Sequence, residues 1–177
     1  MTTSLTRDIE HVILIGDHEQ LRTSLNVHRL SEQFNLDISM FERLINNNFR
    51  NVMLMSQRRM RPEISEVVRC IYPLLTDDQR VMEYPNVRGL SSNYVFFHHQ
   101  FPEDTLAGVQ SKTNPKEAEI IIRFMNYLLQ QNYDPDLITV LSLYAGQLLV
   151  IKNKILKMYP ERDSAIRRIK IRTVDNY

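Results

Sequence analysis

A chain of 177 residues that is 43% hydrophobic and 24% charged has the composition of a globular protein, with enough length for one hydrophobic core or for parts of two. Its net charge of only +1 excludes a protein that attracts nucleic acid through its total charge, so any such surface must be local. The single cysteine, Cys70, excludes an internal disulfide framework and a cysteine-rich zinc site, and it fits a reducing compartment.

The start of the chain gives no sign of export or membrane insertion. Residues 1–10 are polar and lack the apolar core of a signal peptide, and no apolar run is long enough to cross a bilayer. We therefore expect an intracellular protein in the cytoplasm, with a nuclear location left open.

Two apolar runs in the first third of the chain predict strands. Residues 11–15 form a continuous apolar run that ends at Gly16, which is typical of a strand buried on both faces of a parallel sheet. Residues 51–55 predict a second strand. Between them, Ser39 and Glu42 have the spacing of a helix capping box, so we expect a short helix after Ser39.

An arginine-rich stretch follows the second predicted strand. Arg58, Arg59 and Arg61 precede Pro62, which is well suited to the first position of a helix. Three arginines in four positions are either solvated surface charge or a binding site for anions, because the planar guanidinium matches phosphate oxygens. The stretch alone leaves both interpretations open.

The second half of the chain continues the alternation of helices and strands. Asn114 and Pro115 are a favoured cap and a favoured first helical residue. Asp77, Asp78, Pro85 and Gly89 are turn residues, so residues 73–92 are predicted to be irregular. Hydrophobic periodicity then predicts a strand at 94–98, a mobile polar loop at 102–113 and a helix at 115–129. A strand at 137–143, a helix at 145–158 and a strand at 169–174 follow.

Adjacent histidines end the strand predicted at 94–98. Side chains of neighbouring strand residues point to opposite faces, so His98 and His99 cannot readily bind one metal ion. We interpret both as structural residues, and no metal site is predicted.

Strands that alternate with helices predict an α/β fold with a mostly parallel sheet and helices on both of its faces. None of the four glycines begins the phosphate-binding sequence G-x-x-x-x-G-K-[ST]. The chain therefore contains no P-loop.

Four stretches, in the expected order, resemble motifs of superfamily 1 helicases. Residues 15–22 resemble motif III, G-D-x-x-Q-L, and residues 57–62 resemble Q-Y-R-M-x-P. Residues 139–147 are similar to T-P-Y-x-x-Q, and residues 173–177 resemble the start of V-D-x-F/Y-Q-G-x-E. Within the superfamily, the chain is most similar to the large NFX-type zinc-finger-containing helicases, on residues 47–49, 59–64, 89–93 and 101–103.

The resemblance implies an ATP-driven RNA helicase core of RecA-like, P-loop NTPase fold, incomplete in this chain. Two lobes would clamp ATP and magnesium between them, with single-stranded RNA across their top. Residues 1–55 would be the end of the first lobe and residues 56–177 most of the second. The magnesium ligands would lie outside this chain, and protein partners stay undefined.

The resemblance also assigns roles to individual residues. Gln20 and Arg59 would be catalytic, sensing the terminal phosphate from the two sides of the cleft. The nucleotide site would comprise Asp17, Gln20, Gln57, Arg58 and Arg59. Nucleic acid would be contacted by Tyr144, Gln147, Thr173 and Asp175, although Tyr144 fits equally well as a packed tyrosine at a strand end.

Departures from the family pattern keep other functions open. Arg58 stands where the family has an aromatic residue near the adenine, and Ser142-Leu143 replaces Thr-Pro. Without a P-loop, this chain alone is expected not to hydrolyse ATP. Gln20 and Arg59 favour a working motor; the departures allow an RNA-binding scaffold that no longer hydrolyses ATP. A generic α/β ligand-binding domain would require the ordered motifs to be coincidental.

Overall fold

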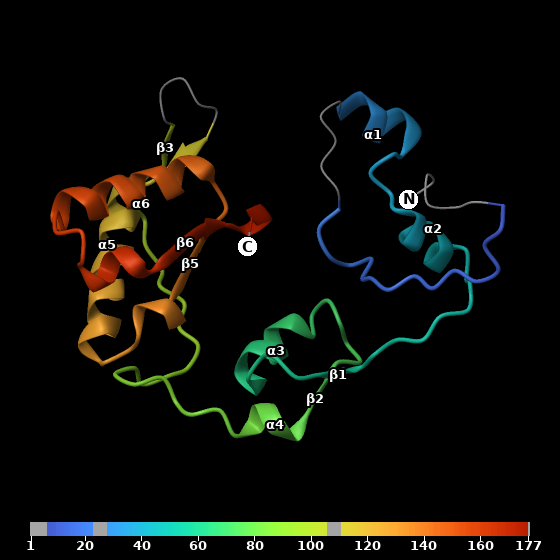
Figure 1. Ribbon diagram of the computed structural model, residues 1–177, viewed down its shortest axis with the longest axis horizontal. Coiled ribbons are helices and arrows are strands. Elements are labelled where there is room, and N and C mark those ends of the chain that lie inside the picture. The colour runs from blue at the N-terminus through green and yellow to red at the C-terminus, as the bar shows by residue number, and fades with distance from the viewer. Residues whose placement is uncertain (1–6, 23–27, 106–110, 177) are drawn as a thin grey trace. The chain divides into compact units, whose positions relative to one another are not determined.

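The structure, a computed structural model, describes residues 7–22, 28–105 and 111–176. The chain divides into two compact units, Met1–Tyr84 and Pro85–Tyr177 (Figure 1). We call these the N-terminal and the C-terminal unit. The predicted boundary between helicase lobes, after residue 55, stays a prediction, because the compact units of this chain do not define lobes.

The N-terminal unit contains short helices and one pair of short parallel strands. Strand β1 pairs with β2 in parallel, in the register Ser56 to Thr76 and Gln57 to Asp77. The elements in chain order are α1 (His28–Phe34), α2 (Met40–Asn46), β1 (Ser56–Gln57), α3 (Pro62–Val68), β2 (Thr76–Asp77) and α4 (Gln79–Met82).

Helix starts in this unit follow their local sequence signals. The Ser39 hydroxyl accepts a hydrogen bond from the backbone N–H of Glu42 (3.0 Å), so the predicted cap of α2 is confirmed. Helix α3 begins at Pro62, also as predicted. Cys70 lies in the turn after α3 and is exposed.

The strands predicted at 11–15, 51–55 and 94–98 are wrong. Ile13 and Ile15, expected to be buried, are 83% and 95% exposed. Residues 51–55 join the ladder only at their last carbonyl, where Met55 accepts from the Thr76 N–H (2.8 Å). A strand requires a neighbour that accepts and donates its backbone hydrogen bonds, and within the described residues no such neighbour pairs with these runs.

The segment 73–92, predicted to be irregular, contains β2 and α4. Asp78, interpreted from the sequence as a turn residue, caps α4, because its carboxylate accepts from the backbone N–H of Arg80 (3.1 Å). The sequence signal for a turn was therefore correct in position, but it marked the start of a helix.

The C-terminal unit carries the longer elements. Strands β5 and β6 pair in parallel, with Thr139 opposite Lys170 and Ser142 opposite Thr173, whereas β3 and β4 pair antiparallel. In chain order the elements are β3 (Asp104–Thr105), β4 (Lys112–Thr113), α5 (Pro115–Gln130), η2 (Pro135–Leu137), β5 (Thr139–Ser142), α6 (Ala145–Met158), η3 (Ala165–Arg168), β6 (Lys170–Thr173) and η4 (Val174–Asn176).

Helices α5 and α6 are predicted well, and the predicted polar loop is partly ordered. Asn114 caps α5 by accepting from the backbone N–H of Glu117 (3.0 Å), as its sequence position indicates. The ends of the loop expected at 102–113 pair as β3 and β4. Residues 106–110 lie outside the described residues.

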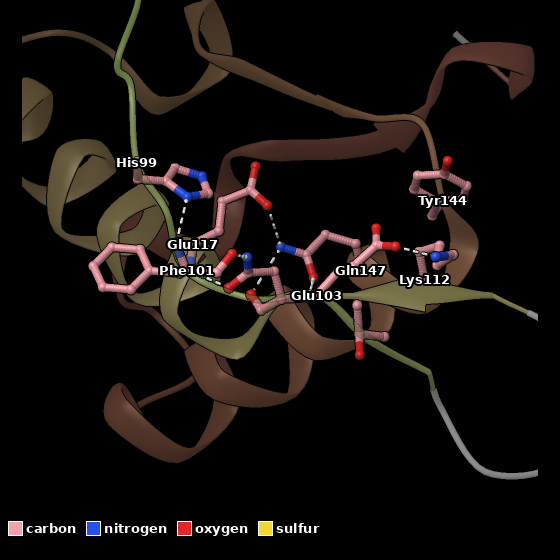
Figure 2. Close-up of a pocket in the computed structure, with 9 residues that line it drawn as sticks. His99, Phe101, Glu103, Lys112, Glu117, Tyr144 and Gln147 are labelled. Carbon is pink, nitrogen blue, oxygen red and sulfur yellow. Dashed lines mark hydrogen bonds and ion pairs between the residues drawn. The ribbon is translucent and has the colours of Figure 1, made fainter.

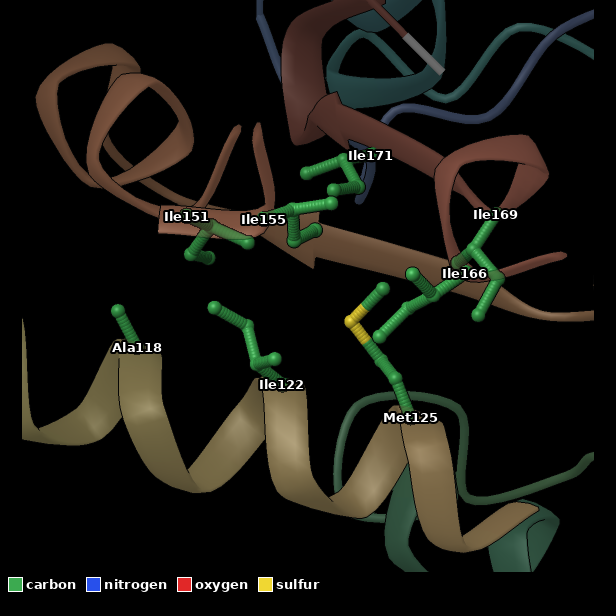
Figure 3. Close-up of a cluster of buried hydrophobic side chains, with 8 residues drawn as sticks. All are labelled: Ala118, Ile122, Met125, Ile151, Ile155, Ile166, Ile169 and Ile171. Atoms are coloured by element: carbon green, nitrogen blue, oxygen red, sulfur yellow. The ribbon is translucent and has the colours of Figure 1, made fainter. Parts of the chain in front are cut away.

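One hydrophobic core holds the C-terminal unit together (Figure 3). Helix α5 faces α6 and β6 across it, and the side chains interdigitate. Its buried members are Ala118, Ile122, Met125, Ile151, Ile155, Ile166, Ile169 and Ile171. The predicted core face of α5 is confirmed at Ala118, Ile122 and Met125. The short parallel strand pairs with their helices make this an incomplete α/β fold.

Among the helices that the structure describes, none is both long enough and apolar enough to cross a membrane.

Candidate functional site

The side chain of Gln57 fixes the loop that carries the adjacent arginines. Its Oε1 accepts from the backbone N–H groups of Arg59 (2.9 Å) and Met60 (2.7 Å). Its Nε2 donates to the Met60 carbonyl (2.6 Å) and to Asp77 Oδ1 (2.7 Å). The amide therefore closes the turn over residues 57–60, and it joins that turn to β2.

Asp77 connects this loop to α3 through its hydrogen bonds, and its side chain is only 4% exposed. Its Oδ2 accepts from Ser65 Oγ (3.0 Å) and from an Arg69 Nη2 atom (2.6 Å), both on the α3 side. The hydrogen bond from Gln57, supported by those from Ser65 and Arg69, holds the pKa of Asp77 below its usual value against the effect of burial. The sequence marked Asp77 only as a turn residue, because its partners lie up to 20 positions away.

The two arginines of the loop are held differently. Arg58 Nε donates to Asp78 Oδ2 (2.8 Å), although its side chain remains 62% exposed. Arg59 is exposed, and its guanidinium forms no hydrogen bond or ion pair with any residue that the structure describes. Arg59 is thus presented on a braced loop with its donors available to an anion.

Asp17 organises the residues that resemble motif III. Its carboxylate accepts from Gln20 Nε2 (2.9 Å), from the Glu19 N–H (3.1 Å) and from the Tyr72 hydroxyl (2.8 Å). Burial tends to raise the pKa of Asp17, but these donors outweigh it and lower the pKa below its usual value. Burial and the bond to Asp17 raise the pKa of Tyr72 to about 12.

Tyr72 was not identified from the sequence, since nothing local ties it to residue 17. The structure thus brings Asp17 and Gln20 together, and Gln57 with Arg58 and Arg59. Within the described residues, no hydrogen bond or ion pair joins Gln20 to Arg59.

A hollow of about 270 Å³ opens in the C-terminal unit where the first turns of α5 and α6 meet (Figure 2). Side chains from the segment before β3 and from the β3–β4 pair complete its wall. It is lined by His99, Phe101, Glu103, Lys112, Thr113, Asn114, Glu117, Tyr144 and Gln147.

Two predicted nucleic-acid contacts, Tyr144 and Gln147, line this hollow, but only one is open to a ligand. Tyr144 is 47% exposed, so it is not the fully packed tyrosine of the alternative interpretation. Gln147 is only 7% exposed, and its amide is bonded to the backbone of Asn114 and to the Glu117 carboxylate. The geometry makes Gln147 a positioning residue at the floor of the hollow.

The other two predicted contacts lie at the end of β6. Thr173 is opposite Ser142 in the strand pair, and Asp175 is exposed in η4. Thr173 also lines a second hollow, whose wall carries four cationic side chains and no acidic one: Lys152, Arg167, Lys170 and Arg172. Positive charge therefore gathers locally beside the predicted nucleic-acid residues, although the chain as a whole is nearly neutral.

No group of three or more His, Cys, Asp or Glu side chains among the described residues is arranged to hold a metal ion. His99 uses Nδ1 to accept from the backbone N–H of Phe101 (3.3 Å).

The incomplete α/β fold and the order of the motifs place the chain in the RecA-like, P-loop NTPase fold class. The sequence profile of the AAA domain family matches residues 36–177. The chain belongs to this family, which is a family of superfamily 1 helicases.

Several known proteins are similar in sequence to nearly the whole chain. It is 41% identical to NFX1-type zinc finger-containing protein 1 of Mus musculus over 175 residues, which cover 98% of this chain and 9% of that protein. It is 37% identical to Helicase required for RNAi-mediated heterochromatin assembly 1 of Schizosaccharomyces pombe, over 96% of this chain and 17% of that protein.

A third relative, Regulator of nonsense transcripts 1 homolog of Arabidopsis thaliana, is 24% identical over 98% of this chain and 14% of its own length. The chain thus spans less than a fifth of each of these proteins. The predicted resemblance to superfamily 1 helicases, and to the NFX-type group among them, is confirmed.

Proposed function

We propose that this chain is part of the motor core of an ATP-dependent RNA helicase, which couples ATP hydrolysis to the binding or remodelling of single-stranded RNA. The family and the helicase names of relatives support the proposal. The observation that carries it is Arg59, a guanidinium without a partner among the described residues, on a loop braced by Gln57. Such a donor stabilises charge on a phosphoryl group only if it is held in place before the reaction.

In this proposal, residues 1–55 end the first lobe and residues 56–177 form most of the second. Arg59 reaches the terminal phosphate of ATP when the cleft between lobes closes, and Gln20 senses the same phosphate from motif III. Asp17 orients the Gln20 amide through their hydrogen bond (2.9 Å), which leaves the amide oxygen of Gln20 to meet the attacking water. The resemblance to superfamily 1 helicases implies that the magnesium bound to ATP is held by residues that this chain does not contain.

Gln57 and Arg58 support the nucleotide site in different ways. The amide of Gln57 acts through the loop, because all its hydrogen bonds go to neighbouring backbone and to Asp77. Arg58 borders the adenine, with its guanidinium held by Asp78. RNA lies over the C-terminal unit, in contact with Tyr144, Thr173 and Asp175. We place the whole protein in the cytoplasm, which fractionation of cells would test.

The second candidate is an RNA-binding scaffold with a helicase fold that does not hydrolyse ATP. The ion pair of Arg58 with Asp78 favours it, since a guanidinium engaged in this way replaces the aromatic residue that the family places near adenine. The two candidates differ in one observable property, the hydrolysis of ATP.

The experiment is ATP hydrolysis by the full-length protein, with and without single-stranded RNA, for the wild type and Arg59→Ala. Loss of a charge-stabilising arginine is expected to lower turnover on the order of a thousandfold or more. Arg80→Ala, which removes another exposed arginine of the same unit, is the matched control. Hydrolysis that is indifferent to Arg59 would assign the catalytic arginine elsewhere, and no hydrolysis at all would favour the scaffold.

A further inference from the structure

We propose that His99 and Phe101 form a stacking site for one unpaired RNA base at one end of the hollow between the first turns of α5 and α6, and that Tyr144, at the other end, stacks on a second base of the same strand. The inference rests on the proposed function, in that the protein must bind RNA. It goes beyond the helicase motifs, because His99 and Phe101 lie outside them and the sequence indicated only a structural role for His99.

His99 and Phe101 lie side by side at one end of the hollow, and Tyr144 lies at its other end (Figure 2). The ring centroids of His99 and Phe101 lie 5.3 Å apart with an interplanar angle of 30°, and those of Phe97 and His99 lie 6.4 Å apart. Phe101 is 44% exposed and Tyr144 is 47% exposed, so both retain free ring surface. Exposed aromatic rings of this kind are the surfaces on which bases of single-stranded nucleic acid stack.

The wall is fixed by hydrogen bonds before any ligand arrives. The backbone N–H of Phe101 donates to His99 Nδ1 (3.3 Å), and its carbonyl accepts from Asn114 Nδ2 (3.0 Å). The side-chain amide of Gln147 in turn forms hydrogen bonds with the backbone N–H and the carbonyl of Asn114. Because the platform does not have to be ordered on binding, less of the stacking energy is lost to conformational entropy.

The size and charge of the hollow favour a base over a phosphate group. Its volume of about 270 Å³ suits one base, since pockets for drug-sized ligands begin at roughly 300 Å³. The carboxylates of Glu103 and Glu117 are part of its lining, and they would repel a phosphate. Glu117 could instead accept a hydrogen bond from an N–H group of the base.

The ion pair between Lys112 and Glu103 stands at the β3–β4 side of the hollow (Figure 2). It neutralises one of the two carboxylates, and it places a cationic group at the edge where the sugar–phosphate backbone of a bound strand would pass. The base would then enter while its phosphate stays outside.

The test is fluorescence anisotropy with the full-length protein and two labelled probes: a single-stranded oligoadenylate RNA, and a strand of equal length in which the bases are replaced by abasic sites. Phe101→Ala and Tyr144→Ala are each expected to weaken oligoadenylate binding by about 5- to 150-fold. Neither is expected to change the affinity for the abasic strand, because backbone contacts are untouched. Phe101→Trp is expected to retain oligoadenylate binding.

Phe124→Ala is the matched control, because Phe124 is also 44% exposed and lies on α5 in stacked contact with Tyr127. If Phe101→Ala does not fold, Tyr144→Ala carries the test by itself. If Phe101→Ala and Tyr144→Ala bind oligoadenylate as tightly as the wild type and the Phe124→Ala control do, the inference is overturned and the proposed function stays intact. An equal loss of affinity for both probes would have the same meaning. A wild-type protein that binds neither probe would overturn the proposed function itself.

Discussion

Gln147 and Asn114 are joined by two hydrogen bonds between a side-chain amide and a backbone: Gln147 Oε1 accepts from the Asn114 N–H (2.7 Å), and Gln147 Nε2 donates to the Asn114 carbonyl (3.1 Å). Both residues are buried, so water cannot replace either bond. The first turn of α6 thereby holds the cap of α5, and a helicase-motif glutamine serves the architecture of the hollow.

Gln147→Ala is therefore expected to loosen the start of α5. It would leave the buried backbone N–H of Asn114 without a partner, at a cost of about 1–3 kcal/mol, and it would remove one of the two hydrogen bonds that the Asn114 carbonyl accepts, the other coming from the Ala118 N–H. Hydrogen-exchange mass spectrometry of the full-length protein should show faster exchange in peptides that cover residues 112–118. Gln130→Ala, at an exposed position of the same helix, is the control, and equal protection in both variants would contradict the prediction.

Any side chain at position 89 in place of glycine is expected to destabilise the C-terminal unit. The φ of Gly89, +79°, is rarely adopted by residues with a Cβ, and a Cβ there would lie 2.7 Å from both the Tyr127 hydroxyl and Gln131 Cγ. Gly89→Ala should therefore destabilise the C-terminal unit by more than about 1 kcal/mol. Limited proteolysis should cut residues 85–93 faster in this variant than in Ser91→Ala, and an unchanged cleavage rate would argue against a strained position.

Asp77 should make stability depend on pH. Its folded-state pKa is lowered, so its contribution is fully present above the unfolded value of about 3.9 and is lost as pH falls through the lowered folded pKa. Asp77→Asn should be less stable than the wild type at neutral pH, and the difference should shrink as pH falls below that value. Unfolding monitored in peptides of α3 tests this.

The control for Asp77 is Asp8→Asn, which removes an exposed carboxylate of the same unit. It should leave stability unchanged at every pH. A constant difference between the wild type and Asp77→Asn across the acid range would show that packing, and not charge, explains the effect of the substitution.

Local signals in the sequence predicted correctly those features of the fold that depend only on nearby residues. Ser39 and Asn114 cap helices whose partners lie three positions away, so both starts were predictable. The runs at 11–15 and 94–98 were not, since strand formation depends on a partner that no local pattern identifies.

The site shows the same division between local and distant partners. Arg58 and Arg59 are adjacent and chemically identical, yet one is paired and the other has no partner among the described residues. The difference arises from Asp78, 20 positions along the chain. Gln57 likewise resembled a nucleotide ligand in sequence, and its loop-closing role became visible only with Asp77 beside it. Sequence motifs thus located the site, while distant partners decided what each side chain does.

The pairing of Arg58 with Asp78 leads to a prediction about nucleotide affinity. If the motor proposal holds, an aromatic residue at position 58 would stack on adenine, whereas the arginine is held by a carboxylate at 2.8 Å. Arg58→Tyr should then lower KM for ATP by about three- to tenfold with kcat unchanged, because stacking acts equally on the ground and transition states. Arg58→Ala should change KM little, and Arg80→Tyr is the matched control. A clear rise in KM for Arg58→Ala would instead show that the guanidinium already contacts the base.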